Sequence, residues 1–272
     1  MKRTILLFAG VLFLGTITIA LAQQAQPVPA AVRSEVDCSG FIAGKNVPED
    51  ITVLDGADDD FNSPIRLFTT GDYIFLRAHG DTKVAVGTEY ALVRNARFTF
   101  EEPWYEGQHA SIRSLGHPYD DVGRVRVTSL TPLGAVAQVT FACGPVFAGD
   151  IALPYQPRPI PEYTPTPEFD PFALPNGKVM GAITAAGGNS GAVGERSIVF
   201  INLGQEDGVQ FGQRFRIFRL VRDRIEGLRA FSDTPRESTG ELIILSTQEK
   251  SSVGIVIRST RDISLGDGIE LE

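Results

Sequence analysis

Hydrophobic and polar residues alternate over several short stretches of this chain. The clearest are Thr88–Arg94, Gly123–Thr128 and Ala135–Phe141, with glycine or proline in the turns between them. A period of two places successive side chains on opposite faces, which is typical of a β-strand with one buried face. We identify no comparable helical pattern, so the chain is predicted to be an all-β protein made of short strands.

The pattern occurs twice along the chain. A shift of 125 residues lays Gly71–Arg94 on Arg196–Arg219 without a gap, and a shift of 117 lays Gly123–Asp150 on Gly240–Asp267. The shifts differ by eight, so the first copy has eight additional residues between its blocks, in the segment that contains Trp104. We infer an internal duplication. The residues that recur unchanged are, in first-copy numbers, Phe75, Val84, Gly87, Arg94, Gly123, Ser129, Val136, Val139, Gly149 and Asp150.

Each copy is expected to hold about five or six short strands within roughly 90 residues. This favours a small closed or partly open β-barrel, because closure removes exposed sheet edges. The predicted fold is two tandem β-barrel-like domains. Structural glycines are expected where positive φ or close backbone approach excludes a Cβ atom. They are Gly87, Gly123 and Gly149 in the first copy and Gly212, Gly240 and Gly266 in the second.

Residues 1–22 are predicted to form a secretory signal peptide. Lys2 and Arg3 precede an uncharged apolar run over Ile5–Ile19, and a small-x-small cleavage motif ends at Ala22. The alternative is a membrane anchor that is retained, for which the apolar run is short. Export to the periplasm, the outer membrane or the medium follows from the first interpretation, and no transmembrane span is expected in the mature chain.

The rest of the chain is divided into four parts. Residues 23–37 are polar and aperiodic, so a flexible leader is expected there, and residues 154–176 are expected to form a proline-rich linker. Eight prolines in that linker oppose both helix and central strand. The alternative is an ordered loop whose aromatic side chains pack on one domain. The first β domain is assigned to residues 38–153 and the second to residues 177–272.

The charge and the cysteines limit the partners and the compartment. Removal of Lys2 and Arg3 with the signal peptide leaves 23 basic against 33 acidic residues, a net charge of −10. Such a chain repels nucleic acid and anionic lipid, so neither is expected as a partner. Cys38 and Cys143 are the two cysteines of the sequence, and in an exported chain they are expected to form a disulfide; two free thiols are the alternative.

The most distinctive side chains lie in the segment that has no match in the second copy. Aromatic rings stack on sugars, so a ligand site for a glycan is considered at these residues, against the alternative that they cover the end of a barrel. The candidate ligand-binding residues are Trp104, Tyr105, His109, His117 and Tyr119.

No catalytic set and no cofactor is predicted. His109 and His117 with Asp120 or Asp121 would suit a metal-dependent hydrolase, but their spacing matches no known ligand pattern. The glycine-rich run around Ser190 lacks a following histidine and fits no nucleophile motif. The acidic run over residues 55–60 lacks the ligand spacing of a calcium loop and is interpreted as a solvated turn.

The second copy carries a resemblance to a known family. Ile201–Arg219, Gly240–Ile257 and Leu265–Leu271 together resemble the C-terminal domain of flagellar assembly protein T and similar exported bacterial envelope domains. The resemblance covers about the last 80 residues well and the first copy faintly. It implies a β domain of the periplasm or outer membrane that serves assembly or envelope contact.

The combined expectation is an exported, non-enzymatic cell-envelope protein that acts as a structural or interaction module. Its partner would be an envelope protein or a glycan, and its oligomeric state is left open. The alternative is a peptidoglycan-binding or other glycan-binding protein that uses the Trp104–Tyr119 segment.

Overall fold

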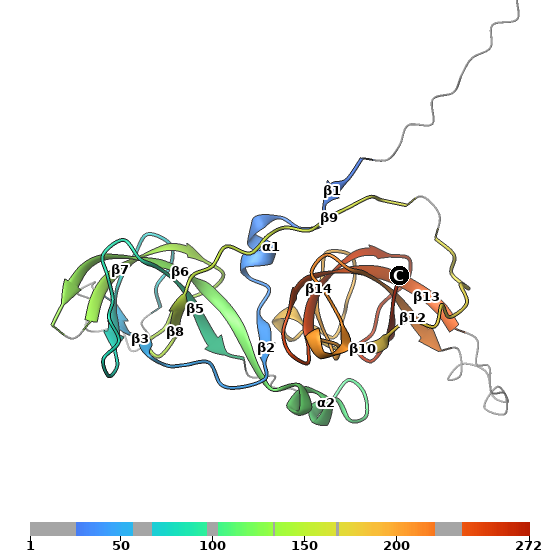
Figure 1. Ribbon diagram of the computed structural model, residues 1–272, viewed down its shortest axis with the longest axis horizontal. Coiled ribbons are helices and arrows are strands. Elements are labelled where there is room, and N and C mark those ends of the chain that lie inside the picture. Colours follow the sequence, from blue (N-terminus) through green and yellow to red (C-terminus); the bar gives the residue numbers. More distant parts are fainter. Residues whose placement is uncertain (1–25, 57–66, 97–102, 133, 167–168, 221–235) are drawn as a thin grey trace, which may run out of the picture.

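Two β-barrels lie side by side in the computed structural model, which describes residues 26–56, 67–96, 103–132, 134–166, 169–220 and 236–272 (Figure 1). The predicted signal peptide and most of the acidic run over residues 55–60 lie outside these ranges. Within them, no helix has the length and hydropathy needed to cross a lipid bilayer.

Barrel 1 is a closed sheet of six strands in the order β3-β4-β7-β6-β5-β8, with β8 paired back to β3. Its interior is filled by alternate residues of these strands, such as Ile74, Leu92 and Val125. A short strand, β2 (Phe41–Ala43), extends the sheet by pairing with β6. The barrel strands are β3 (Ile51–Gly56), β4 (Tyr73–Ala78), β5 (Glu89–Asn95), β6 (His117–Thr131), β7 (Gly134–Ala142) and β8 (Ile151–Pro154).

Barrel 2 is also closed, in the order β10-β11-β14-β13-β12-β15. Its interior contains Phe215, Ile217 and Leu242, which are completely buried. Two single 3-10 turns, η1 (Gly187–Asn189) and η2 (Gln205–Asp207), lie in its connections. The strands are β10 (Met180–Ala186), β11 (Ile198–Ile201), β12 (Arg214–Leu220), β13 (Arg236–Thr247), β14 (Ser252–Ser259) and β15 (Gly268–Leu271).

The two barrels have the same strand order, so the prediction of two tandem barrels is confirmed. Strands β3, β4, β5, β6, β7 and β8 correspond to β10, β11, β12, β13, β14 and β15. An ion pair is repeated at equivalent positions: Arg94 contacts Asp150 at 2.6 Å and Arg219 contacts Asp267 at 2.7 Å. In each copy the same carboxylate also accepts a backbone N–H three residues earlier at 2.8 Å. The repeated pair therefore fixes the turn that leads into the last strand of each barrel.

The glycines shared by the two copies have two different structural roles. Gly87, Gly149 and their counterparts have φ between 78° and 92°, a region that strongly favours glycine. Gly123 and Gly240 instead lie at bulges, where a Cβ atom would come within 2.4 Å of the carbonyl oxygen of the neighbouring strand. That contact is closer than atoms can approach, so the bulge requires glycine.

The expectation of a flexible leader over residues 23–37 is wrong for the part that the structure describes. β1 (Val28–Pro29) pairs with β9 (Glu162–Tyr163), and α1 (Arg33–Asp37) follows. Ala30, Ala31 and Val36 are at most 2% exposed because they pack on the outer face of barrel 2. The segment is polar by composition, but its few apolar side chains meet an apolar surface.

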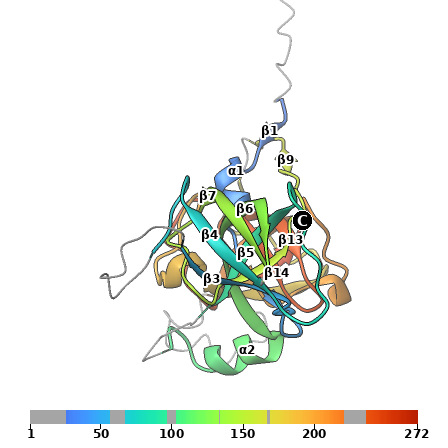
Figure 2. The same cartoon turned by 90° about the vertical axis from the view of Figure 1, so that its left-hand side faces the viewer.

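The proline-rich segment over residues 154–176 is an ordered loop rather than a free spacer where it is described. Ile160 and Tyr163 pack on the same outer face of barrel 2, and the guanidinium of Arg258 lies 5.5 Å from the ring of Phe169. Figure 2, which views the molecule from the barrel 1 side, shows β1 and β9 above the barrels. The extended conformation that proline imposes is thus used to cross the outside of the fold.

Replacing either bulge glycine with alanine is expected to destabilise the protein by about 1 to 3 kcal/mol, because the backbone must move to admit the Cβ atom. Urea unfolding of Gly123→Ala and Gly240→Ala measures the change in free energy. Gly144→Ala is the matched control, since nothing lies within 4 Å of its Cβ position; its stability should change by less than about 1 kcal/mol. Equal stability of all three variants would contradict the close approach.

Candidate functional site at the junction of the two barrels

The N-terminal segment contacts both barrels as it passes between them. β2 pairs with β6 of barrel 1, while the side chain of Ile42 is buried against Phe200 and Val253 of barrel 2. The hydroxyl of Ser251 donates to the carbonyl of Ile42 at 3.0 Å. Residues 28–43 therefore tie the barrels together.

A short helix makes the second connection. α2 (Gln108–Leu115) lies in the part of the first copy that carries the additional residues, and it packs on β10 of barrel 2. Ile112 and Leu115 are each 6% exposed and contact the apolar face of barrel 2. The amide of Gln108 donates to the carbonyl of Thr184 at 2.9 Å. The segment that diverged between the copies thus joins the two barrels.

The predicted ligand-binding residues are not gathered on one surface. Trp104 is 57% exposed and its ring lies over Gly191. Tyr105 is half-buried and lies over Gly266, just before β15. It packs against the core of barrel 2 and so covers that core beside this turn. Burial is the main cause of its raised pKa. His109 is half-buried on α2 and His117 is exposed at the start of β6.

Tyr119 cannot be a surface platform for a sugar in this structure. It is 3% exposed and its ring stacks on Phe41, with the centroids 5.4 Å apart. Its hydroxyl accepts the N–H of Val47 at 3.2 Å. The strand predicted over Gly123–Thr128 begins earlier in the structure, at His117, and Tyr119 is one of its buried residues. Among the residues that the structure describes, no group of three or more His, Cys, Asp or Glu side chains could hold a metal ion.

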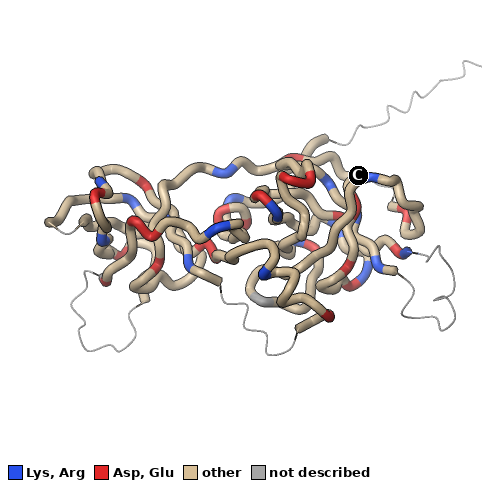
Figure 3. The backbone as a smooth tube through the Cα atoms, turned by 60° about the horizontal axis from the view of Figure 1, so that its bottom comes forward, with Lys and Arg blue, Asp and Glu red and all other residues tan. Residues whose placement is uncertain are grey.

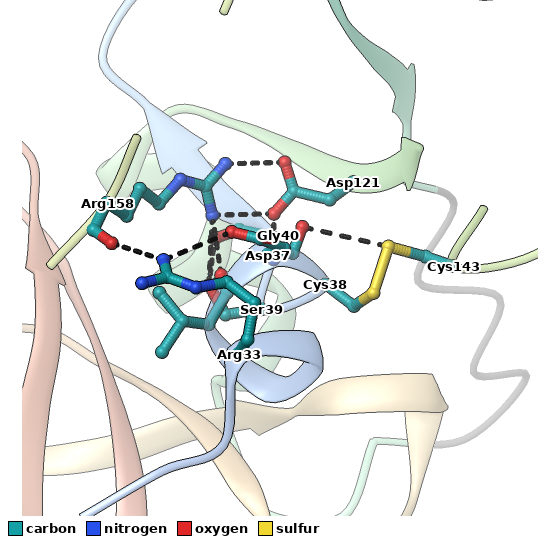
Figure 4. The surroundings of a disulfide bond; sticks show 9 residues. Arg33, Asp37, Cys38, Ser39, Gly40, Asp121, Cys143 and Arg158 are labelled. Atoms are coloured by element: carbon teal, nitrogen blue, oxygen red, sulfur yellow. Dashed lines mark hydrogen bonds and ion pairs between the residues drawn. A yellow bond between two sulfur atoms is a disulfide. The ribbon is translucent and has the colours of Figure 1, made fainter. Parts of the chain in front are cut away.

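A disulfide and a partly buried ion pair hold the end of α1 and the residues that follow it against barrel 1 at the junction (Figure 4). The predicted bond between Cys38 and Cys143 is confirmed, and it joins α1 to the end of β7. Beside it, Arg158 makes two contacts with the carboxylate of Asp121, at 2.6 and 2.7 Å, and the N–H of Gly40 donates to the same carboxylate at 2.8 Å.

Arg158 links the linker to the N-terminal segment. Its guanidinium also donates to the carbonyl of Val36 at 3.0 Å and to the hydroxyl of Ser39 at 3.2 Å. Burial lowers its pKa, but the hydrogen bonds to Asp121 and the charges of Asp121 and Asp37 outweigh burial, so the pKa of Arg158 is raised. The guanidinium therefore stays charged and holds these segments together.

A cleft of about 300 Å³ opens next to this ion pair, between the barrels. Barrel 1 lines it with side chains that include Arg124, Phe141 and Tyr155, and barrel 2 lines it with Ser246 and Gln248. The guanidinium carbon of Arg124 lies 4.5 Å from the centroid of the Tyr155 ring and 6.0 Å from that of Phe141. Cation–π contacts of this kind hold a guanidinium in place without neutralising it.

At the position of barrel 2 that is equivalent to Arg124, the residue has the opposite charge. Arg124 pairs with Ala91 and Phe141 across the strands of barrel 1, and Glu241 pairs with Arg216 and Arg258 at the same place in barrel 2. Burial is the largest cause of the raised pKa of Glu241, followed by the charge of Glu272, while the neighbouring arginines act in the opposite direction.

Sequence reasoning did not select Arg124, although a signal was present in the alignment of the two copies. The 117-residue shift places arginine against glutamate at this position, and phenylalanine against arginine next to it on the neighbouring strand. A reversed charge within an otherwise repeated pattern of residues indicates a surface that has different neighbours in the two copies. Figure 3 shows that elsewhere Lys and Arg are interspersed with Asp and Glu over both barrels.

The chain was compared with protein-family models and with curated proteins, and neither comparison finds a match.

Removing the apolar contact of α2 is expected to uncouple the barrels. Ile112→Ala together with Leu115→Ala should cost about 2 to 5 kcal/mol per site, since each deletes a buried side chain. Differential scanning calorimetry should show one transition for the unchanged protein and two for the double variant. Arg113→Ala, on the exposed side of the same helix, should behave as the unchanged protein to within about 0.5 kcal/mol. Identical single transitions for all three proteins would contradict a coupling role.

Proposed function

We propose that this chain is an exported, non-enzymatic interaction module of the bacterial cell envelope. The observation that carries the proposal is the Cys38–Cys143 disulfide, because stable disulfides form mainly in oxidising compartments. The signal-like N-terminus agrees with that compartment. The resemblance of the second copy to envelope β domains supplies the envelope as the place of action.

The architecture supports a binding or scaffolding role. β2, α2 and the linker join the two barrels through buried contacts, so a partner would meet both barrels together. The charged groups around the junction mostly serve structure: Asp121 is paired with Arg158, and Glu35 with Arg196. Contacts that order a binding surface in advance lower the entropic cost of binding, which suits an interaction module.

Expression of the full chain in a bacterial host tests this proposal. The mature protein is expected in the periplasmic or outer-membrane fraction, with a mass that begins after Ala22 and with both cysteines resistant to alkylation until reductant is added. Full-length protein in the cytoplasm with two alkylated thiols would contradict export. A pull-down from envelope fractions is expected to recover a specific protein or glycan, and an empty pull-down would count against the interaction role.

Glycan binding is a second candidate because Trp104 remains exposed in the segment that is peculiar to the first copy. The protein should then sediment with purified sacculi, and Trp104→Ala should weaken the binding about fivefold or more. Phe172→Ala is the matched control, since it removes an aromatic ring that is 67% exposed on the linker. Protein that stays in the supernatant, or equal binding by both variants, excludes this candidate.

A further inference from the structure

Two residues that line the cleft between the barrels each carry a side-chain polar atom with no hydrogen-bond partner among the described residues. These atoms are Nε of Arg124, on barrel 1, and the hydroxyl oxygen of Ser246, on barrel 2, and both are buried. Buried polar atoms are normally paired, because an unpaired one loses its bonds to water without replacement. The two residues that carry these atoms line the same cleft, one from each barrel, which indicates that the cleft is shaped for a polar group.

The other charges of the cleft are already compensated. Arg158 and Asp121 form their two-fold contact, and Asp37 lies 3.7 Å from Arg33 within α1. Arg124 is therefore the cation of the described cleft residues that lacks a carboxylate. Its contacts with Tyr155 and Phe141 hold the guanidinium but leave its charge available.

On the equivalent face of barrel 2, the charged side chains are paired with one another. In barrel 2, Glu241 lies 3.6 Å from Arg258, and Glu272 pairs with Arg214 and Arg216. In barrel 1 the positions equivalent to Arg216, Arg258 and Glu272 carry an alanine, a phenylalanine and a tyrosine instead of charged residues. The pairs are Ala91 and Arg216, Phe141 and Arg258, and Tyr155 and Glu272. Barrel 1 thus surrounds a single cation with apolar walls.

We propose that the cleft binds a small organic carboxylate with a compact apolar or aromatic body. The planar guanidinium of Arg124 matches a carboxylate, and the hydroxyl of Ser246 donates to one of its oxygens. Phe41, Phe141 and Leu153 supply the apolar surface for the rest of the ligand. The volume of about 300 Å³ lies at the lower end of the range of small-molecule sites. This site is independent of the cellular location of the protein.

Calorimetric titration of the purified mature chain with benzoate, phenylacetate and N-acetylphenylalanine tests the proposal. At least one acid is expected to bind, and its neutral amide should bind about tenfold more weakly or not at all. Tight binding of N-acetylphenylalanine relative to the two simple acids would identify a peptide carboxyl terminus as the source of the group. The reverse order would identify a free small molecule.

Arg124→Gln keeps a hydrogen-bonding side chain but removes the charge, and it should weaken acid binding about tenfold or more. Arg126→Gln is the matched control: it lies two residues away on the same strand, is ion-paired to Glu89 outside the cleft, and should bind as the unchanged chain does. Methyl-group NMR of the unchanged chain, in which Leu153 should shift on addition of acid, keeps the test valid if a variant fails to fold. The proposal is overturned if no acid binds up to about 10 mM, or if Arg124→Gln binds as well as Arg126→Gln.

Discussion

The outer face of barrel 2 must be covered, and much of the rest of the structure follows from that constraint. Four residues that point outward from β13 and β14 are isoleucine or leucine, and all four are buried: Ile243, Leu245, Ile255 and Ile257. Burying such a side chain is worth roughly 1.5 to 3 kcal/mol. The N-terminal segment and the linker provide this cover, so they are ordered although neither has a strong structural signal of its own.

The equivalent positions of barrel 1 explain why the N-terminal segment and the linker cover the outer face of barrel 2 and not that of barrel 1. A shift of 117 residues replaces these four apolar side chains by polar ones, which lie on the solvent side of β6 and β7. The replacements are Arg126, Thr128, Gln138 and Thr140. Barrel 1 can therefore face water, as a sheet with alternating residues normally does, whereas barrel 2 has a sheet with two apolar faces. The duplication kept the inner face and changed the outer one.

The all-β class, the two barrels and the disulfide could be predicted because they depend on local alternation, on repetition and on cysteine count. That residues 26–37 have an ordered structure could not be predicted, because it depends on the outer face of barrel 2, which is distant in the sequence. A signal did exist: Leu242–Leu245 is four apolar residues in a row, which indicates burial on both faces of a strand. α2 was not predicted because the helix has only eight residues. Its apolar contact residues, Ile112 and Leu115, give just one helical spacing of three residues.

The candidate cleft was harder to foresee, since its walls come from segments about 120 residues apart and its key residue is ordinary in isolation. What distinguishes Arg124 is the comparison with Glu241, which keeps its partners. By contrast, the pair of Arg94 with Asp150 is repeated as Arg219 with Asp267, because it fixes a turn that both barrels need. Between duplicated domains, a polar pair that is retained therefore indicates a shared structural requirement of the fold. A charge that is reversed indicates that the two domains have different surroundings at that position.

Arg196 shows how strongly the N-terminal segment is held against barrel 2. It is the one non-glycine residue with positive φ in the described chain, at 70°, and the equivalent residue of barrel 1 is Gly71. Such a conformation costs of the order of 1 kcal/mol for a residue with a Cβ atom. Its guanidinium pairs with Glu35 and donates to the carbonyl of Ala30 at 3.2 Å, and these contacts offset the strain. Because the disulfide and Arg158 hold the other side of the same segment, both walls of the cleft are positioned before any ligand enters, and binding there requires little reorganisation.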